Sequence, residues 1–287
     1  MIRKFLTTAA LVLAAALPAA ADPLAKDVFG AANGSTGGPP TAIGFYSKGC
    51  IAGAVQLPES GPSWQVMRLS RHRNWGHPQL VSFLVGLSRA AQQVGWPGLY
   101  IGDMSQPRGG PMVTGHASHQ MGLDADIWML PPTSLRLSVA QREKLSSQSV
   151  VNAAGTAPSA LWSNAHMAIL RAAASDPRVE RVFVDPVAKV AMCQTATGDR
   201  SWLRKIRPIN NHNYHFHVRL ACPAGSVCQQ QDAPPPGDGC NEAAEWIKNR
   251  IDPSRVKPVP PDPNYRHPRS YRLSEMPRQC QAVATAR

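Results

Sequence analysis

The sequence has no pair of cysteines separated by two residues, which argues against a cysteine-rich zinc framework. Beyond the N-terminal segment, no uncharged apolar run approaches the roughly 18 to 20 residues that a membrane-spanning helix needs. Acidic side chains are few, with 18 Asp+Glu against 30 Lys+Arg, and no internal repeat is present. These absences argue against a cysteine-rich zinc finger, a spanning helix later in the chain and a repeat architecture.

The N-terminus has the three features of a secretory signal peptide. Arg3 and Lys4 form a basic region, an uncharged apolar run covers residues 5–17, and residues 19–21 provide an A-x-A cleavage site. No cysteine follows this site to carry a lipid. We therefore expect residues 1–21 to be removed and the mature protein to be exported to the periplasm.

Six cysteines remain after this cleavage, and an even number in an oxidising compartment indicates up to three disulfides. Six cysteines allow 15 pairings, so the connectivity stays open. Cys222 with Cys228 would close a local loop, and Cys50 with Cys280 could tie the chain ends together. Cys193 and Cys240 are the other candidates.

The mature chain is strongly basic. Cleavage removes Arg3 and Lys4 and no acidic residue, which lowers the 30 Lys+Arg to 28 against 18 Asp+Glu, a net charge of +10. Such a field attracts polyanions, which outside the cytoplasm are cell-wall glycopeptide and anionic lipid rather than nucleic acid. Charge that serves only solubility is the alternative.

The pattern of apolar residues predicts an α+β fold, a small antiparallel sheet with packed helices. Helices are predicted at residues 77–96 and 159–175, and strands at 99–104, 124–129, 181–186 and 215–220. Proline-rich stretches at 233–237 and 256–263 cannot enter a central strand. We expect residues 22–231 to form the main domain. Residues 232–287 would form a disulfide-tied, extended wrap of the same domain, with one helix at 241–251.

The segment HNYHFHVRL, residues 212–220, would have one apolar face and one face of ionisable side chains as a strand. Side chains of a strand alternate between faces, so His215, His217 and Arg219 share one side while three apolar residues share the other. Two histidines and an arginine on one face suggest a functional site. A histidine-rich surface strand is the alternative that this segment alone leaves open.

A second cluster, GHASHQMGLDADIW at residues 115–128, favours the functional interpretation. His119 precedes Asp126 by seven residues, Gly122 can turn the chain between them, and Asp124 and Asp126 share one strand face. If this strand lies beside residues 215–220, a His, Asp, His set can surround one ion. Three protein ligands and an open position are typical of catalytic zinc.

The two motifs together resemble the penicillin-insensitive murein endopeptidases, peptidase family M74, within the wider group of zinc peptidases that includes lysostaphin-type enzymes and D-Ala-D-Ala peptidases. Segments such as SKGCIAGA, VMRLSRHRNWGHP, RVFVDP and SWLRKIRP extend the likeness over nearly the whole mature chain. The resemblance implies a zinc endopeptidase that cleaves D-alanyl to meso-diaminopimelyl cross-links of peptidoglycan. The implied metal ligands are His119, Asp126 and His217, the implied catalytic residue is His215, and His212 and His116 are further catalytic candidates.

The sequence departs from this pattern at two places. Many members of the wider group carry a glutamate three residues before the last zinc histidine, where this chain has Tyr214. A histidine base or transition-state donor is therefore implied, and Asp124 would orient a ligand. Some family members hold a second metal with the histidine that matches His116, but residues 146–155 contain neither the aspartate nor the histidine that this needs. We expect one zinc per chain, with His116 as the weaker candidate for a second site.

The remaining histidines and tryptophans favour structural roles. This applies to His72, His77, His166, His267, Trp128, Trp162 and Trp246. Arg71, Arg73 and Trp75 could bind wall carboxylates or form a solvated basic loop, and both interpretations stay open.

Two other functions compete with a murein endopeptidase. A non-catalytic zinc module that binds wall peptide would not need His215 and His116, which argues against it. A secreted His-metal nuclease would suit the positive charge, but the Asp126 and two-histidine set prefers zinc. The expected partner is peptidoglycan, without nucleic acid or a membrane span, and a homodimer stays an open option.

Overall fold

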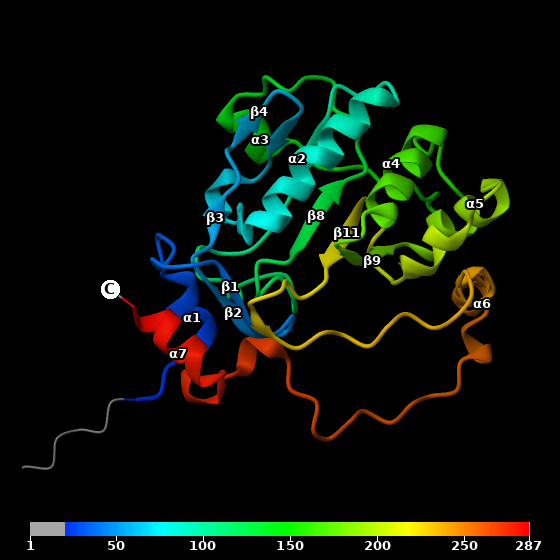
Figure 1. Ribbon diagram of the computed structural model, residues 1–287. Coiled ribbons are helices and arrows are strands. Elements are labelled where there is room, and N and C mark those ends of the chain that lie inside the picture. The colour runs from blue at the N-terminus through cyan, green and yellow to red at the C-terminus, as the bar shows by residue number, and fades with distance from the viewer. Residues whose placement is uncertain (1–20, 287) are drawn as a thin grey trace, which may run out of the picture.

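A seven-stranded sheet forms the centre of the computed structural model, which describes residues 21–286 (Figure 1). The predicted signal peptide lies outside these residues apart from Ala21. The strand order is β10-β9-β11-β8-β7-β5-β4. In chain order the bounds are β4 Ser60–Gly61, β5 Trp64–Val66, β7 Leu99–Ile101, β8 Asp124–Trp128, β9 Val179–Val184, β10 Ile206–Pro208 and β11 His215–Leu220.

The predicted α+β fold is confirmed, but the central sheet is not purely antiparallel. β8, β11 and β9 are antiparallel neighbours, whereas β9–β10 and β5–β7 are parallel pairs. Each parallel pair is joined through a helix, α5 (Pro186–Thr195) or α2 (Pro78–Gln93). A parallel connection needs such a crossover. The alternation within a strand shows which side is buried but not the direction of its partner, so the sequence could not predict these two pairs.

Helices α2 and α4 (Asn164–Ser175) lie against the central sheet (Figure 1). Leu80, Phe83, Leu84 and Leu87 of α2 are buried in the same core as Phe216 and Val218 of β11. The two helices correspond to the predictions at 77–96 and 159–175, and both are shorter. α4 begins later because Ser163 forms a capping box with its first turn.

Strand β9 ends two residues before the predicted end. Residues 181–186 were predicted as a strand, whereas β9 ends at Val184. Asp185 ends the strand because its carboxylate accepts a hydrogen bond from the Val187 N–H at 2.9 Å and Pro186 occupies the first position of α5. α5 itself was not predicted. The other helices missed from the sequence are α1 (Ala25–Gly30), α3 (Val139–Lys144) and α7 (Arg278–Thr285).

A second, smaller unit of structure holds the two ends of the described chain together. A three-stranded sheet contains β1 (Thr41–Phe45), β2 (Lys48–Ala52) and β12 (Val227–Cys228), and α1 and α7 lie beside it (Figure 1). Two further strands, β3 (Val55–Gln56) and β6 (Trp75–Gly76), form a separate pair. None of the helices in residues 21–286 is long and apolar enough to cross a membrane.

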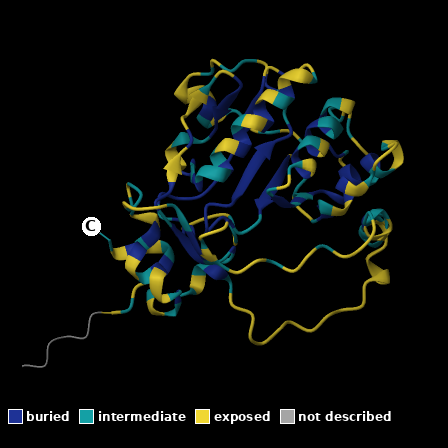
Figure 2. Ribbon diagram, viewed as in Figure 1, coloured by how far each residue is buried: buried dark blue, intermediate teal, exposed yellow. Residues whose placement is uncertain are grey.

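Three disulfides join all six cysteines, as the even count predicted. Cys50–Cys280 connects β2 to α7, Cys193–Cys240 connects α5 to α6 (Cys240–Ile251), and Cys222–Cys228 closes a short loop. The predicted helix at 241–251 corresponds to α6. Residues 252–266 then run along the molecule as an exposed segment before the chain reaches α7 (Figure 2). Short 3₁₀ helices occur at Leu69–Arg71 (η1), Ser201–Lys205 (η2), Pro253–Arg255 (η3), Pro268–Ser270 (η4) and Leu273–Glu275 (η5).

Candidate metal centre and active site

The two strands that carry the predicted site residues are neighbours. β8 and β11 are antiparallel, and their register places His217 opposite Asp126, Arg219 opposite Asp124 and His215 opposite Trp128. On the other side of both strands, Ile127, Phe216 and Val218 are buried in the apolar core. The sheet therefore presents the histidines and carboxylates on one face and fixes their register through the other face.

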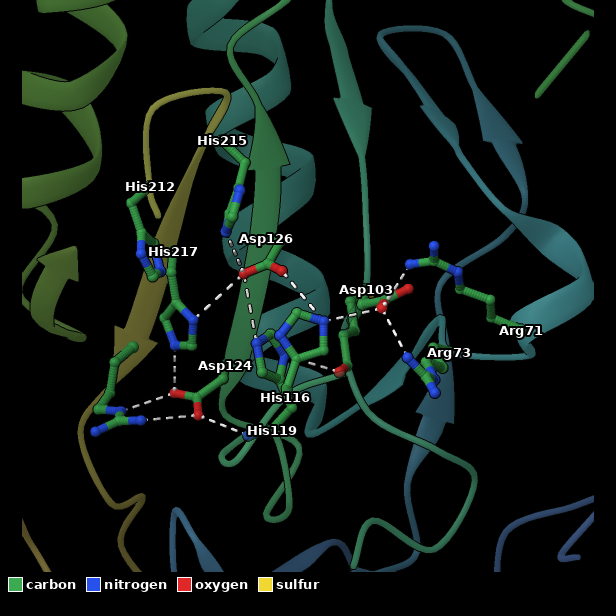
Figure 3. Close-up of polar contacts among 12 residues, drawn as sticks. Arg71, Arg73, Asp103, His116, His119, Asp124, Asp126, His212, His215 and His217 are labelled. Atoms are coloured by element: carbon green, nitrogen blue, oxygen red, sulfur yellow. Dashed lines mark hydrogen bonds and ion pairs between the residues drawn. The ribbon is translucent and has the colours of Figure 1, made fainter. Parts of the chain in front are cut away.

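Asp126 is the centre of the cluster (Figure 3). Its Oδ1 atom lies 3.3 Å from His217 Nδ1 and 3.4 Å from His119 Nε2, and its side chain is 8% exposed. Burial raises the pKa of this carboxyl, but the imidazoles of His215 and His119 outweigh burial and hold the pKa well below its usual value. Asp126 is therefore a carboxylate at neutral pH and can serve as a ligand to a cation.

Asp124 lies on the same strand face and contacts the opposite edge of His217. Its Oδ1 is 3.3 Å from His217 Nε2, and Arg219 donates to both of its oxygens, at 2.9 and 3.1 Å. The His119 backbone N–H donates to Oδ2 at 3.0 Å. Asp124 thus holds the orientations of the His217 ring and of the loop that carries His119.

The loop before β8 brings His119 into the cluster. Its ring is fully buried, and Nδ1–H donates to the Met104 carbonyl at 2.9 Å, which leaves Nε2 facing Asp126. His119 adopts a left-handed conformation with φ 68°, which is uncommon for a residue other than glycine. Gly122 is also left-handed, and a Cβ there would lie 2.7 Å from Ile51 Cδ1. This loop therefore requires Gly122, as its predicted turning role implied.

His116 bridges the cluster to a residue that the sequence did not single out, Asp103. His116 Nε2 lies 2.9 Å from Asp103 Oδ2 and 3.5 Å from Asp126 Oδ2. Asp103 Oδ2 also accepts from Arg71 and Arg73. Burial raises the Asp103 pKa, but the hydrogen bond from His116 and the charge of Arg73 lower it to about 2. Asp103 follows β7 within GDM, and no spacing in the sequence connects it to His116.

His215 and His212 form a layer beside the ligand candidates. His215 Nε2 lies 3.6 Å from Asp126 Oδ1, and the ring of His212 lies 4.7 Å from that of His215. Burial lowers the pKa of His215, and burial with the nearby His215 lowers the pKa of His212 to about 4. Both imidazoles are therefore neutral near pH 7, when His215 can accept a proton.

The cluster has the donor atoms of a metal site. His119 Nε2 and Asp126 Oδ1 are buried and have no hydrogen-bond partner within residues 21–286, and His217 Nδ1 lies 3.3 Å from the same Asp126 oxygen. Donor atoms of His116, His119 and Asp126 lie within 4.8 Å of one another. Nitrogen and carboxylate ligands in a set of three or four suit zinc. The residues therefore fit a zinc ion. The group within 4.8 Å contains His116, whereas the predicted ligand His217 lies beside it through the 3.3 Å contact of its Nδ1 with Asp126 Oδ1.

A cleft of about 570 Å³ opens onto this cluster. His116, Asp126 and His215 line it, together with Asp103, Tyr214 and Trp128. Arg68, Arg71 and Arg73 line it as well, so the RHRNW segment borders the site instead of forming a separate basic loop. Tyr214, the residue at the place of the missing glutamate, is 44% exposed at its edge.

The histidines predicted to be structural make local contacts away from the cluster. His77 caps α2, His166 donates to the Met129 carbonyl, and His267 accepts from the Arg269 N–H. His72 packs edge-on against Trp75. Trp162 stacks on His166, Trp246 is partly buried, and Trp128 packs against Tyr100 while it also borders the cleft.

Comparison with known proteins identifies the family of this chain. Residues 42–285 match the model of the family described as penicillin-insensitive murein endopeptidase, peptidase family M74. The chain belongs to this family. It is 43% identical over 234 residues to the penicillin-insensitive murein endopeptidase of Haemophilus influenzae, which covers 80% of this chain and 82% of that protein. It is 42% identical over 251 residues to the protein of the same name from Klebsiella pneumoniae, which covers 86% and 87% of the two chains. The family match extends through the Pro-rich segment to α7.

Proposed function

We propose that this protein is a zinc-dependent murein endopeptidase that hydrolyses D-alanyl to meso-diaminopimelyl cross-links in peptidoglycan. The observation that carries the proposal is the buried group formed by His119, Asp126 and His217 in a family member: Asp126 and His217 lie opposite each other on β8 and β11, and the loop before β8 brings His119 to Asp126. These three residues would hold one zinc ion per chain. A bound zinc polarises the scissile carbonyl and lowers the pKa of water to about 7.

The chain's own residues then have separate tasks. Asp124 orients His217 through the 3.3 Å contact with Nε2, as carboxylates commonly do for histidine ligands. His215, neutral near pH 7, accepts a proton at Nε2, the atom that faces Asp126, and can donate it to the leaving amine. His212 and His116 are the other catalytic candidates: His212 lies beside His215, and His116 lines the cleft. His116 is also the weaker candidate for a metal ligand.

The cleft supports a reaction that does not use a nucleophilic serine. Ser146 and Ser147 border it, but Ser146 Oγ accepts from Arg68 and Ser147 Oγ donates to the Tyr214 carbonyl. Within residues 21–286 neither hydroxyl has an imidazole partner that would activate it. Penicillin acts by trapping a serine nucleophile, so the proposed enzyme should be insensitive to it.

Its place of action follows from its substrate. We propose that residues 1–21 direct export to the periplasm and that residues 22–231 form the zinc endopeptidase domain. Residues 232–287 are a disulfide-tied extension of the same domain. The Cys193–Cys240 and Cys50–Cys280 disulfides and the family match through residue 285 support the single domain.

The test is digestion of isolated sacculi followed by identification of the muropeptides by mass. Cross-linked dimers should become monomers, equally with and without penicillin, and a chelator should stop the reaction. Cleavage of glycan strands or of nucleic acid, with cross-links intact, would contradict the proposal. Binding to sacculi without cleavage would indicate a non-catalytic wall-binding module.

A further inference from the structure

The 3₁₀ turn η1 holds an arginine at the rim of the cleft. Two residues that flank it, Arg68 and His72, are left-handed with φ 58° and 52°, a conformation that is unfavourable outside glycine. The turn is fixed from outside, because Ser70 donates from its backbone N–H and its hydroxyl to Glu143 of α3, at 2.8 and 2.9 Å. Uncommon backbone conformations that persist at a cleft are often part of a functional site.

The guanidinium of Arg71 is held by one residue, Asp103, through only one of its three nitrogens. Its Nη1 donates to Asp103 Oδ2 at 3.0 Å, and the side chain is 47% exposed. The Arg71 side chain makes no other hydrogen bond within residues 21–286, so Nη2 and Nε are free to bind a ligand. Arg73, by contrast, is 9% exposed and uses Nη1 on Asp103 and Nη2 on Thr114. Arg68 donates to Ser146 and lies 5.9 Å from the Trp128 ring.

Asp103 places this arginine next to the candidate metal ligands. The same oxygen that accepts from Arg71 accepts from His116 Nε2, and that nitrogen is 3.5 Å from Asp126. Figure 3 shows Asp103 between Arg71 and His116. A group bound by Arg71 would therefore lie beside a peptide bond held at the cluster. The cleft is lined by three arginines and two carboxylates, Asp103 and Asp126, which favours an anionic group at this rim.

We propose that Arg71 binds the carboxylate attached to the carbon next to the scissile nitrogen, and so selects the residue whose amine is freed by cleavage. This inference rests on the proposed endopeptidase function. In the cross-link, the amide nitrogen is attached to one end carbon of diaminopimelate, and that carbon also carries a carboxyl group. An arginine offers a planar pair of donors that matches a carboxylate. Recognition of this group distinguishes diaminopimelate from an amine without an adjacent carboxylate.

The test compares two soluble cross-linked peptide dimers that differ only in this group, a free carboxylate or a carboxamide. We expect the wild-type enzyme to prefer the carboxylate by about ten- to a hundredfold in kcat/KM, the range for a hydrogen bond to a charged group. Arg71→Gln should lose this preference, because it slows cleavage of the carboxylate dimer and leaves cleavage of the carboxamide dimer near the wild-type rate. Arg89→Gln, which removes an exposed charge on α2, should keep the preference.

The outcomes separate the inference from the proposed function. If the wild-type enzyme cleaves neither dimer, the endopeptidase proposal fails. If it cleaves both equally well, or if Arg71→Gln retains the preference, the inference fails while the endopeptidase function stands. An equal loss on both dimers would show that Arg71 acts through Asp103 on His116, which also overturns the inference. Zinc content, measured in parallel, should be the same for Arg71→Gln and wild type.

Discussion

His217 lies directly opposite Asp126 across the β8–β11 pair, with His217 Nδ1 3.3 Å from Asp126 Oδ1. A slip of one residue in this pairing would turn His217 to the apolar face and Val218 toward the cleft. Burial of Phe216 and Val218 in the core opposes that slip. The geometry of the candidate metal centre is therefore stabilised by the packing on the other side of the same strands.

The first prediction concerns zinc content. The purified mature protein should hold about one zinc per chain, because His119, Asp126 and His217 provide the three protein ligands of one site. His119→Ala and His217→Ala should each reduce the bound zinc to near zero, measured by elemental analysis after dialysis. His267→Ala, which removes a histidine that only caps the Arg269 N–H, is the matched control and should retain zinc.

The same experiment distinguishes His217 from His116 as the third ligand. His116 belongs to the group whose donor atoms lie within 4.8 Å, so it is the alternative third ligand. We expect His116→Ala to keep most of the zinc, because Asp103 already holds its Nε2 at 2.9 Å. Zinc retained in His217→Ala but lost in His116→Ala would assign the site to His116, His119 and Asp126 instead.

The second prediction separates catalysis from metal binding at His215. His215→Ala should retain zinc and lose about a hundred- to ten-thousandfold in kcat, the usual contribution of a general acid-base group. Its Nε2 is 3.6 Å from Asp126, close to the ligands without being required to complete the set. Single-turnover cleavage of a cross-linked dimer would measure the rate. Loss of zinc in this variant would mean that His215 is a ligand.

Much of this site could be predicted from the sequence because alternation within a strand is a local property. The sequence alone shows that Asp124 and Asp126 share a face, and that His215 and His217 share another. The resemblance to a family supplied the partnership between the two strands, which the register then shows. Asp103 was missed because its role comes from contacts with Arg71 and His116, on loops whose paths the local pattern does not determine. The parallel pairs β9–β10 and β5–β7 were missed for the same reason.

The third prediction concerns Lys189, a lysine of α5 that has no exposed surface. Its ammonium donates to the carbonyls of Leu203 and Asp238. Burial lowers its pKa from 10.5 to about 7 in the folded protein. Between these two values the unfolded chain binds more protons at this group than the folded chain does. The contribution of Lys189 to the free energy of unfolding therefore increases as pH rises from about 7 to about 10.

Lys189→Met should remove that pH dependence. The free energy of unfolding, from urea titrations at saturating zinc with the disulfides intact, should rise in wild type relative to Lys189→Met by a few kcal/mol over this pH range, since one pKa unit is worth about 1.36 kcal/mol. Lys248→Met, an exposed lysine of α6, is the control and should follow wild type. A constant difference between wild type and Lys189→Met across the range would contradict the assigned direction.

The last prediction ranks the three disulfides by the length of chain that each closes. Their sequence separations are 230 residues for Cys50–Cys280, 47 for Cys193–Cys240 and 6 for Cys222–Cys228. A disulfide that closes a longer loop removes more conformational entropy from the unfolded chain. Replacing Cys50 and Cys280 by alanine should therefore lower the free energy of unfolding by about 3 kcal/mol more than replacing Cys222 and Cys228, with the Cys193 and Cys240 pair between them. Urea unfolding of the three double variants gives the order. Cys50–Cys280 also fastens α7 to β2, and β2 contacts the loop that carries His119, because the Gly49 N–H donates to the Gln120 side chain at 3.1 Å. Zinc content, measured on the same double variant, shows whether the loss of stability reaches the candidate metal centre. Equal losses for all three pairs would show that native contacts around each bridge, and not loop length, determine how much it stabilises the fold.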